Sequence, residues 1–197
     1  MVTFLLATRN RKKGFELRRL LKGIPIRFLT LDQFPGIPPV SEDRSTLRSN
    51  AVKKAVETSR HTILPVLADD SGLEVQFLDG LPGVRSARFA GPAQNDGANN
   101  AKLLKLMAGV PASKRRARFV CWLAVAIGGR LVQTFQGDCS GFIALKPAGQ
   151  KGFGYDPIFI PQGCQQTMAQ VSPRRKDLLS HRAKALAKLK SWLKTAL

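Results

Sequence analysis

The stretch PVLADDSGLEV, residues 65–75, places two adjacent carboxylates, Asp69 and Asp70, at the end of an apolar run. A Ser-Gly pair follows, and a second apolar run then covers residues 73–78. This pattern predicts a strand, a polar turn and a second strand, with Asp and Ser side chains capping backbone amides in the turn. Adjacency alone carries little weight, because 13 acids among 197 residues give roughly one adjacent pair by chance. The residues of this stretch alone therefore favour a structural turn slightly over a functional site.

Length and composition indicate a folded chain. A sequence of 197 residues with 44% hydrophobic content can bury the core of one domain, organised as one body or as two lobes. No apolar stretch reaches the roughly 18 residues of a membrane span, and the N-terminal basic residues follow the apolar run, the wrong order for a signal peptide. The three cysteines are widely spaced and have only His61 and His181 as companions. We therefore expect neither a disulfide framework nor a zinc site, no membrane partner and a cytoplasmic location.

The net charge of +19, from 32 Lys and Arg against 13 Asp and Glu, predicts attraction to phosphate groups. Charge alone does not distinguish nucleotides, nucleic acids and acidic membranes. Much of the excess lies in a C-terminal segment with the spacing of an amphipathic helix that opens at Ser172 and Pro173. Its cations are Arg174, Arg175, Lys176, Arg182, Lys184, Lys188, Lys190 and Lys194. The default expectation is a surface helix with a solvated basic face.

Hydrophobic periodicity predicts the other elements. Strands are expected over residues 2–7 and 24–30, with a helix from about 12 to 21 between them. Ser45 is a candidate cap for the next helix, and NDGANNAKLLKLM is typical of another. RARFVCWLAVAIGGRLVQTF predicts two antiparallel strands around a Gly-Gly turn. The order of elements predicts an α/β or α+β fold built on one mixed sheet.

Two loops carry residue types suited to nucleotides. Thr8, Asn10 and Lys13 lie where a strand enters a helix, so free backbone amides and a cation could face an anion. Strand–loop–helix joints containing a lysine are common, however. The stretch GFGYDPIF from residue 152 holds two aromatic rings between glycines, a pattern that fits a purine-stacking loop or, more often, a packed surface bend. The tripeptide SHR at residues 180–182 adds donors, which on a basic helix are more often solvated than functional.

Taken in order, TRNRKK, LADDSGLEV, LPGVRSARFAG, GFGYDPIF and SHRAKAL resemble successive motifs of the inosine triphosphate pyrophosphatase family, also called XTP/dITP diphosphatases. The match runs from about residue 2 to residue 189. The resemblance implies a Mg²⁺-dependent, cytosolic, homodimeric enzyme that hydrolyses ITP, dITP and XTP to the monophosphate and pyrophosphate. It also implies one domain over residues 1–197: a long bent mixed sheet, helices around two lobes, and a central substrate cleft.

The resemblance gives the acidic pair a role in this chemistry. It implies that Asp70 is the general base with contact to Mg²⁺, and that Asp69 supports the metal. Successive strand residues point to opposite faces of a sheet. Both carboxylates can therefore serve one metal only if the expected turn rotates one of them.

The resemblance also implies a set of substrate contacts. They are Thr8, Asn10, Lys13, Ser71, Phe153, Gly154, Tyr155, Asp156, Lys176, His181 and Arg182. Lys13 would offset charge on the leaving pyrophosphate, and Ser71 would contact the phosphate or ribose. Phe153 would stack on the base. Donors from His181 and Arg182 facing O6 would accept hypoxanthine or xanthine and disfavour adenine, whose amino group would meet another donor.

Two stretches differ from the family pattern. SNA places Ser49 where the family has a metal-supporting Glu, and TMAQV places Met168 and Gln170 where Phe and Glu are usual. The loss of a charge at position 49 predicts a greater demand for Mg²⁺. Glu42 and Asp43, upstream of the same helix, would compensate if their loop folds over the cleft.

Two alternatives stay open beside this enzyme. A basic nucleic-acid-binding protein on the same scaffold would explain the charge, although stacking aromatics are few and no basic run matches a groove-reading motif. A Maf-like pyrophosphatase acting on other modified nucleotides is a second alternative. The GFGYDP and SHR stretches argue against it.

Overall fold

The computed structural model describes residues 2–196. Its strands are β1 (Val2–Leu6), β2 (Ile26–Thr30), β3 (Val66–Val75), β4 (Arg116–Ile127), β5 (Arg130–Ile143) and β6 (Phe159–Pro161). Its α-helices are α1 (Arg11–Leu20), α2 (Leu47–Ser59), α3 (Asp96–Leu106), α4 (Pro173–Leu179) and α5 (His181–Ala196). Short 3-10 helices are η1 (Leu31–Gln33), η2 (Gln76–Leu78), η3 (Gly83–Arg88), η4 (Ala112–Lys114) and η5 (Asp156–Ile158).

The six strands form one sheet in the order β2-β1-β3-β4-β5-β6. Strand β1 is parallel to both of its neighbours, with Leu5 opposite Leu29 of β2 and Val66 of β3. Strands β5 and β6 pair antiparallel, and Gly128 and Gly129, both with positive φ, make the turn between β4 and β5. The sheet is therefore mixed, and the predicted mixed α/β fold is confirmed.

The chain divides into two compact units, which we call unit 1 and unit 2. Unit 1 holds the described residues 2–70, 121–137 and 182–196, and unit 2 holds residues 71–120 and 138–181. Strands β3, β4 and β5 contribute residues to both units. That the whole chain works as one domain stays a prediction.

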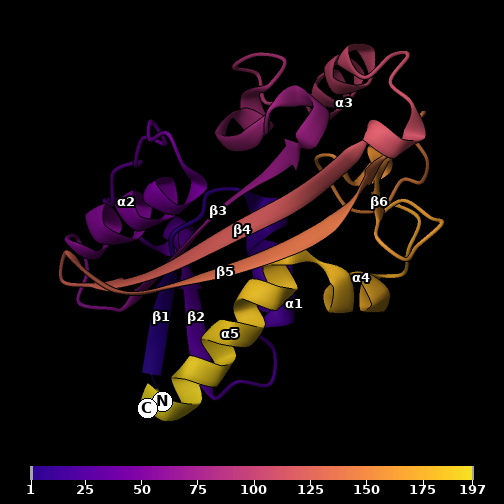
Figure 1. The fold of residues 1–197 in the computed structure, drawn as a ribbon. Helices are drawn as coiled ribbons and strands as arrows, with labels where there is room; N and C mark the ends of the chain where they lie inside the picture. Colours follow the sequence, from indigo (N-terminus) through magenta and orange to yellow (C-terminus); the bar gives the residue numbers. More distant parts are fainter. Residues whose placement is uncertain (1, 197) are drawn as a thin grey trace. The chain divides into compact units, whose positions relative to one another are not determined.

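In unit 1, helices α1 and α5 cover one face of the sheet and α2 covers the other (Figure 1). Strand alternation decides which side chain meets which helix. Phe4 packs with Leu17 of α1 and Leu186 of α5. Leu5, the next residue along β1, packs with Ala51 of α2. The sheet of unit 1 is thus buried on both faces, which explains its near-continuous apolar strands.

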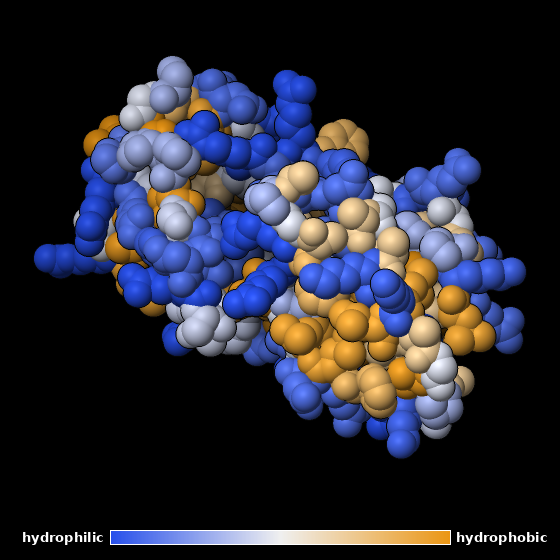
Figure 2. All heavy atoms as spheres, turned by 90° about the horizontal axis from the view of Figure 1, so that it is seen from above, coloured by the Kyte–Doolittle hydropathy of each residue, from blue (hydrophilic) through white to orange (hydrophobic). Residues whose placement is uncertain are grey.

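Hydrophilic residues cover much of the face seen in Figure 2, and hydrophobic residues gather in one area of it. The hydrophilic cover agrees with the net charge of +19. Across residues 2–196, no helix is both long enough and apolar enough to cross a membrane.

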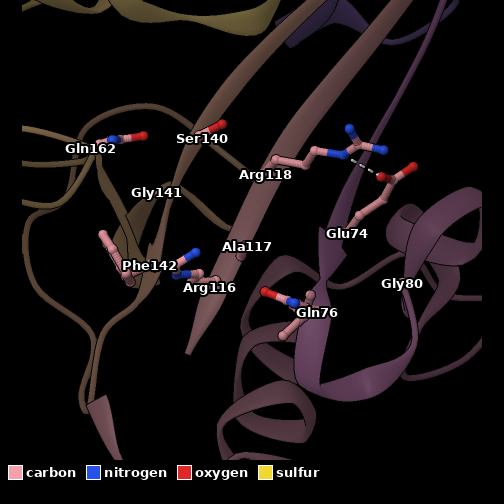
Figure 3. Close-up of a pocket in the computed structure, with 11 residues that line it drawn as sticks. Glu74, Gln76, Gly80, Arg116, Ala117, Arg118, Ser140, Gly141, Phe142 and Gln162 are labelled. Atoms are coloured by element: carbon pink, nitrogen blue, oxygen red, sulfur yellow. Dashed lines mark hydrogen bonds and ion pairs between the residues drawn. The ribbon is translucent and has the colours of Figure 1, made fainter. Parts of the chain in front are cut away.

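In unit 2, alternation along the strands separates a polar face from an apolar one. Glu74 of β3 and Arg116 and Arg118 of β4 line a pocket of about 500 Å³ with Ser140 and Phe142 of β5 (Figure 3). None of the predicted site residues lines this pocket.

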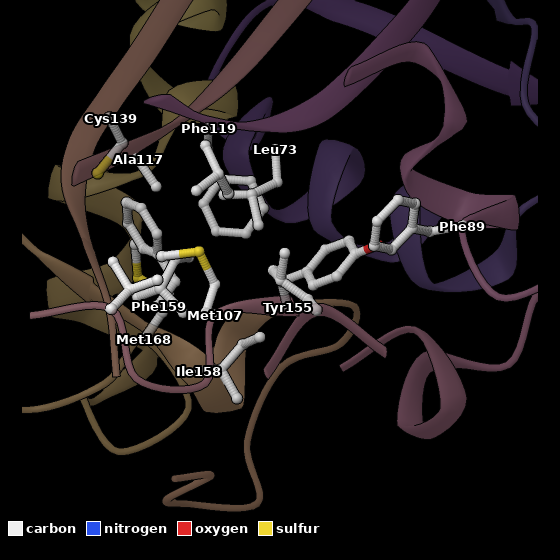
Figure 4. Close-up of a cluster of buried hydrophobic side chains, with 14 of the residues drawn as sticks. Leu73, Phe89, Met107, Ala117, Phe119, Cys139, Tyr155, Ile158, Phe159 and Met168 are labelled. Atoms are coloured by element: carbon white, nitrogen blue, oxygen red, sulfur yellow. The ribbon is translucent and has the colours of Figure 1, made fainter. Parts of the chain in front are cut away.

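The intervening strand residues of unit 2 enter the hydrophobic core shown in Figure 4. Leu73 and Phe119 pack there with Met107, which follows α3, and with Tyr155 and Phe159. Phe119 and Phe159 meet edge to face, with ring centroids 4.6 Å apart. Helix α3 and the segment around residue 155 are therefore anchored in the same core.

The expected turn at Ser71 and Gly72 is wrong, because β3 runs without interruption from Val66 to Val75. Gly72 is needed inside the strand because of a close backbone contact: a Cβ there would lie 2.4 Å from the carbonyl oxygen of Gly83. The next amide, that of Leu73, donates to the Ser86 hydroxyl at 2.9 Å. Gly72 therefore marks packing against η3 and not a change of chain direction.

Two helix predictions also need correction. The cap of α2 is Thr46 and not Ser45: its hydroxyl accepts from the Ser49 amide at 3.0 Å. The C-terminal segment forms two helices, because Ser180 adopts an extended conformation with φ −68° and ψ 147° between α4 and α5. The predicted solvated basic face is wrong for Lys176 and Arg182, which are both buried. Burial of two cations suggests partners of opposite charge.

Candidate functional site

The loop between β1 and α1 places Lys13 in the first turn of a helix. Asn10 is the N-cap of α1, and its Oδ1 accepts a hydrogen bond from the Lys13 amide at 3.1 Å. The Thr8 hydroxyl accepts from the Asn10 amide at 3.2 Å. Thr8 and Asn10 thus fix the shape of the loop and the start of the helix, which directs the Lys13 side chain.

Because β3 runs through both residues, strand alternation assigns Asp69 and Asp70 to opposite faces of the strand. Asp69 shares the face of Leu67 and meets α1 and α5: its Oδ2 lies 3.3 Å from Lys13 Nζ and 3.5 Å from Arg182 Nε. Asp70 shares the face of Ala68, on the side of α2. Lys13 and Lys54 nevertheless act electrostatically on both carboxylates, and a shared role of the two in metal binding stays a prediction.

The two carboxylates differ in electrostatic state. Burial alone would raise the pKa of Asp69, but Lys13 and then Arg182 hold it well below its ordinary value. Burial raises the pKa of Asp70 to about 6, against the opposing effects of Lys13 and Lys54 and with smaller contributions from Glu42 and Asp69. Asp69 is therefore a permanent anion, while Asp70 exchanges a proton near neutral pH.

Lys13 connects the two acids electrostatically. Burial alone would lower the pKa of its ammonium, but Asp69 and then Asp70 hold it above the ordinary value. Lys13 therefore stays charged at neutral pH. A fixed cation next to a carboxylate that titrates near pH 6 is an arrangement typical of catalytic centres.

Arg182 was predicted to meet the base together with His181, but the structure gives the two residues different partners. The Arg182 guanidinium pairs with the carboxylates of Glu16 and Asp69, and it is buried. The His181 ring stacks on Phe119 in unit 2, with centroids 4.8 Å apart and 12° between the planes. Glu16 was not predicted from the sequence, although it is the only acid in α1 and lies one turn after Lys13.

Glu42 joins Asp69, Asp70 and Lys13 in unit 1, as the hypothesis from the sequence allowed. It pairs with Lys54 of α2, and its charge acts on Lys13 and Asp70. Burial alone would raise the pKa of Glu42, but Lys54 holds it below the ordinary value. Buried Asn50 shapes this loop by accepting from the Arg44 amide at 2.9 Å. The hydrogen bond between Asn50 and the Arg44 amide, which the sequence does not reveal, thus shapes the loop that brings Glu42 to the site.

The other two residues of the metal hypothesis point elsewhere. Asp43 is exposed and pairs with Lys53 at 2.8 Å. The Ser49 hydroxyl bonds to the Thr46 hydroxyl at 2.7 Å and to its carbonyl oxygen at 2.9 Å. Position 49 is therefore the N3 position of the α2 capping box, where a Glu would also satisfy the helix start.

In unit 2, Phe153 to Asp156 and Lys176 form one group. The Asp156 carboxylate accepts from the Phe153 amide at 2.9 Å and from Lys176 Nζ at 2.5 Å. Lys176 Nζ also lies 5.2 Å from the centroid of the half-buried Phe153 ring, a cation–π contact. Because Lys176 occupies one face of this ring, a nucleobase could stack only on the other.

Tyr155 and Ser71 have less direct positions in unit 2. The Tyr155 ring lies in the hydrophobic core, and its hydroxyl donates to the Ser86 carbonyl oxygen at 2.9 Å. Burial raises the pKa of Tyr155, so the phenol stays protonated. Ser71 is a half-buried residue of β3. Tyr155 therefore anchors the Phe153 segment in the hydrophobic core, and a role of either Tyr155 or Ser71 in substrate contact stays a prediction.

The two departures in TMAQV are structural substitutions. Met168 lies in the hydrophobic core of unit 2. Gln170 accepts at Oε1 from the Thr167 amide at 2.9 Å, closing a short turn as a Glu carboxylate would.

The donor set of unit 1 suits a hard divalent cation. Carboxylate oxygens of Asp70 and Glu42 are the ligands that Mg²⁺ prefers, and one or two carboxylates plus substrate phosphates are the usual arrangement. Within residues 2–196, no cluster of three or more His, Cys, Asp or Glu side chains forms a self-sufficient metal site. The residues therefore fit a cation that arrives with phosphate oxygens.

Fold and site together define a class: a mixed α/β protein whose buried carboxylate–lysine centre suits phosphate chemistry. The chain belongs to the Ham1 family, whose sequence profile matches residues 4–192. The resemblance noted in the sequence is confirmed by relatives with the name dITP/XTP pyrophosphatase.

The relatives are similar over nearly their full length. The chain is 47% identical over 184 residues to the dITP/XTP pyrophosphatase of Desulforamulus reducens, covering 93% of this chain and 92% of that protein. It is 48% identical over 189 residues to that of Geobacillus kaustophilus, covering 96% and 93%. A HAM1 protein structure from Coxiella burnetii matches with a TM-score of 0.90 and 36% identity, covering 99% of this chain and all of that one.

Proposed function

We propose that this protein hydrolyses dITP, XTP and ITP to the nucleoside monophosphate and pyrophosphate in the cytoplasm. Membership of the Ham1 family and the relatives named dITP/XTP pyrophosphatase support this activity. The observation that carries it is the buried Asp70, whose pKa is raised to about 6 beside the cation of Lys13. A base with that pKa can take a proton at neutral pH.

In the proposed reaction, water attacks the α-phosphorus and Asp70 takes the proton that the water loses. The bond from the α-phosphorus to the oxygen that bridges to the β-phosphorus breaks, and pyrophosphate leaves. Lys13 stays protonated and offsets the charge that develops on the leaving group. Asp69, paired with Lys13 and Arg182, orients that lysine. The chain thus supplies a base and an electrostatic stabiliser from neighbouring elements.

We further propose that Asp70 and Glu42 hold Mg²⁺ together with the substrate phosphates, and that Asp69 acts mainly through Lys13. The sequence assigned Asp69 to the metal. Its Oδ2 now lies against two cations, which supports the indirect role. When bound, Mg²⁺ supplies charge neutralisation on the phosphate oxygens.

We assign binding of the substrate's nucleobase to the Phe153 group in unit 2. The purine is assigned to the Phe153 face opposite Lys176, and the Lys176 ammonium, which pairs with Asp156, is assigned as a donor to a purine oxygen. Arg182 is not needed for base recognition in this assignment, because its guanidinium is paired with Glu16 and Asp69.

We also propose that the protein is a homodimer. The pocket face of unit 2 supports this, since it carries Glu74 and two arginines beside the partly exposed Phe142. A two-fold interface brings the same patch together from both chains, so a patch with both charge signs can be self-complementary. Sedimentation velocity of the wild type and of Phe142→Glu tests this proposal, with a shift to monomer expected for the variant.

Pyrophosphate release tests the proposed activity. The assay compares ITP, XTP and dITP with ATP, GTP and CTP, each with and without Mg²⁺, for the wild type and for Asp70→Asn. We expect release from the first three in the presence of Mg²⁺, and a loss of about 10²–10⁴-fold in kcat for the variant. Equal rates on all six nucleotides would refute the proposed specificity. Retention of more than about a tenth of kcat by Asp70→Asn would refute the assigned base.

A further inference from the structure

Gly154 lies in the middle of the Phe153 group and has a left-handed backbone, with φ +64°. On one side of it, Gly152 must also be glycine, because a Cβ there would lie 1.9 Å from Asp156 Oδ2. The Asp156 carboxylate closes this tight loop through the Phe153 amide and Lys176. These contacts set the internal shape of the segment and join Asp156 to Lys176 of α4, but they do not hold Gly154 itself.

Helix α3 holds Gly154 through hydrogen bonds to both the amide and the carbonyl oxygen of that residue. The Asp96 carboxylate accepts from the Gly154 amide at 3.0 Å, and Asn100 Nδ2 donates to the Gly154 carbonyl oxygen at 3.0 Å. Asp96 and Asn100 are four residues apart and so lie on the same face of the helix. One face of α3 therefore binds Gly154 through one acceptor and one donor. This geometry defines the position and the direction of the Gly154 backbone.

Helix α3 is itself firmly anchored in unit 2. Leu103 is fully buried in the core, and Asn95 caps the helix by accepting from the Ala98 amide at 2.9 Å. Asn99, beside Asn100, accepts from the Ala90 amide at 2.7 Å and so ties the helix to the segment after η3. A rigid element with a two-point hold restrains a loop more strongly than side chains of the loop alone.

We propose that Asp96 and Asn100 are positioning residues that hold Gly154, and through it present the Phe153 ring for stacking on the nucleobase. This proposal rests on the proposed function, because it deepens the base site assigned there. Neither residue touches the substrate in it. They reduce the conformational freedom that the Phe153 loop would otherwise lose when a nucleotide binds.

Loss of the hydrogen bonds to Gly154 should weaken nucleotide binding more than it slows the chemical step. A loosened loop must be ordered at the expense of binding energy, so KM for ITP rises while kcat, set in unit 1, changes little. Loss of one hydrogen bond of this kind corresponds to about three- to tenfold in affinity. Inorganic tripolyphosphate has no base to stack, so its inhibition constant should not change.

The experiment compares Asp96→Ala and Asn100→Ala with two conservative variants and one control. Asp96→Asn keeps an acceptor for the Gly154 amide and should restore wild-type KM. Asn100→Asp replaces the donor with an acceptor that faces a carbonyl oxygen, so it should behave like Asn100→Ala or worse. Asn95→Ala removes the helix cap without touching Gly154 and serves as the matched control for lost helix stability. Phe153→Ala reports on the base site itself.

Hydrogen exchange of the peptide that spans residues 150–156 tests the hold without substrate. Faster exchange in both alanine variants, together with a raised KM for ITP and an unchanged tripolyphosphate constant, is the expected result. Unchanged exchange would overturn the hold, and faster exchange with unchanged KM would overturn its positioning role. An equal rise of KM in Asn95→Ala would reduce the effect to stability. Loss of the proposed function would look different: the wild type would not turn over ITP, or Phe153→Ala would leave its KM unchanged.

Discussion

The guanidinium of Arg182 donates a hydrogen bond to the carboxylate of Glu16, a residue 166 positions earlier in the chain. Both residues are buried, with Arg182 3% and Glu16 4% exposed. The same arginine lies 3.5 Å from Asp69, which in turn meets Lys13. Two cations and two anions thus form a chain of ion pairs in the order Glu16, Arg182, Asp69 and Lys13, which runs from α1 through α5 to β3 and back to α1. Removal of one member leaves the others with an unbalanced charge.

Glu16→Ala should therefore destabilise the protein strongly. The Arg182 guanidinium would lose its nearest anion while staying buried, a change that typically lowers the free energy of unfolding by about 3–5 kcal/mol. Urea unfolding at pH 7 measures this loss. Glu16→Gln should lose less, because its amide oxygen still accepts a hydrogen bond.

A surface ion pair gives the matched control for Glu16. Asp43 pairs with Lys53 at 2.8 Å in unit 1, where the aspartate side chain is more than half exposed. Asp43→Ala should change the free energy of unfolding by less than about 1 kcal/mol. A loss of similar size in both variants would show that the Glu16 pair contributes no more than a surface pair.

The sequence predicts the sheet and most helices because hydrophobic periodicity reports burial directly. Lys13, Asp69 and Asp70 are singled out by the family resemblance, because the residues around Asp69 and Asp70 by themselves favour a structural turn. The sequence could not show that Gly72 lies inside a strand, because a turn and a close backbone contact both select glycine. Nor could it show Glu16 beside Arg182, since pairing over this separation depends on how the helices pack.

The raised pKa of Asp70 predicts that catalysis and stability oppose each other at this residue. The pKa is about 6 in the folded, metal-free protein and close to its ordinary value of 3.8 in the unfolded chain. The folded state then binds more protons between pH 4 and 6, so this group lowers the free energy of unfolding as pH rises through that window. Asp70→Asn removes the effect and should stabilise the metal-free protein at pH 7 by about 2–3 kcal/mol.

Urea unfolding in EDTA at pH 4 and pH 7 measures this difference for the wild type and Asp70→Asn. The gain should be small at pH 4, where the wild-type carboxyl is also largely neutral. Asp43→Asn is the control, because Asp43 is exposed and its pKa is lowered through the hydrogen bond from Lys53. A gain for Asp70→Asn that does not depend on pH would contradict a raised pKa.

The basic surface should speed the capture of nucleotides. Helix α5 alone exposes Lys184, Lys188 and Lys194. Screening by salt weakens attraction between exposed charges, so kcat/KM for ITP should fall as NaCl rises from 50 to 300 mM, while kcat stays nearly constant. For comparison, fluorescence anisotropy measures the affinity of the protein for a labelled RNA and a labelled DNA oligonucleotide. Tight binding that persists at about 0.15 M salt would support a nucleic-acid-binding protein instead.

The last prediction concerns the loop that brings Glu42 to the site. Glu42→Gln removes one of the two carboxylates proposed for Mg²⁺, and it should raise the Mg²⁺ concentration for half-maximal ITP hydrolysis by about 10- to 100-fold. Ser49→Glu, which the sequence alone predicts to lower that concentration, should leave it unchanged, because position 49 caps α2. The same variant should keep or raise the melting temperature, since a Glu at N3 can form the capping box that Ser49 forms here.

A magnesium titration at fixed ITP distinguishes the two positions. Asp43→Asn is the control for Glu42, because its carboxylate is the neighbour in sequence but pairs with Lys53 in solvent. Asn50→Ala extends the test: without the Arg44 hydrogen bond the loop loses its anchor, so the Mg²⁺ midpoint should rise although Glu42 is intact. A lower midpoint in Ser49→Glu would place that side chain at the metal. An unchanged Mg²⁺ midpoint in Glu42→Gln would show that Glu42 does not bind the metal. Asp70 and the phosphates would then be the metal's anionic ligands.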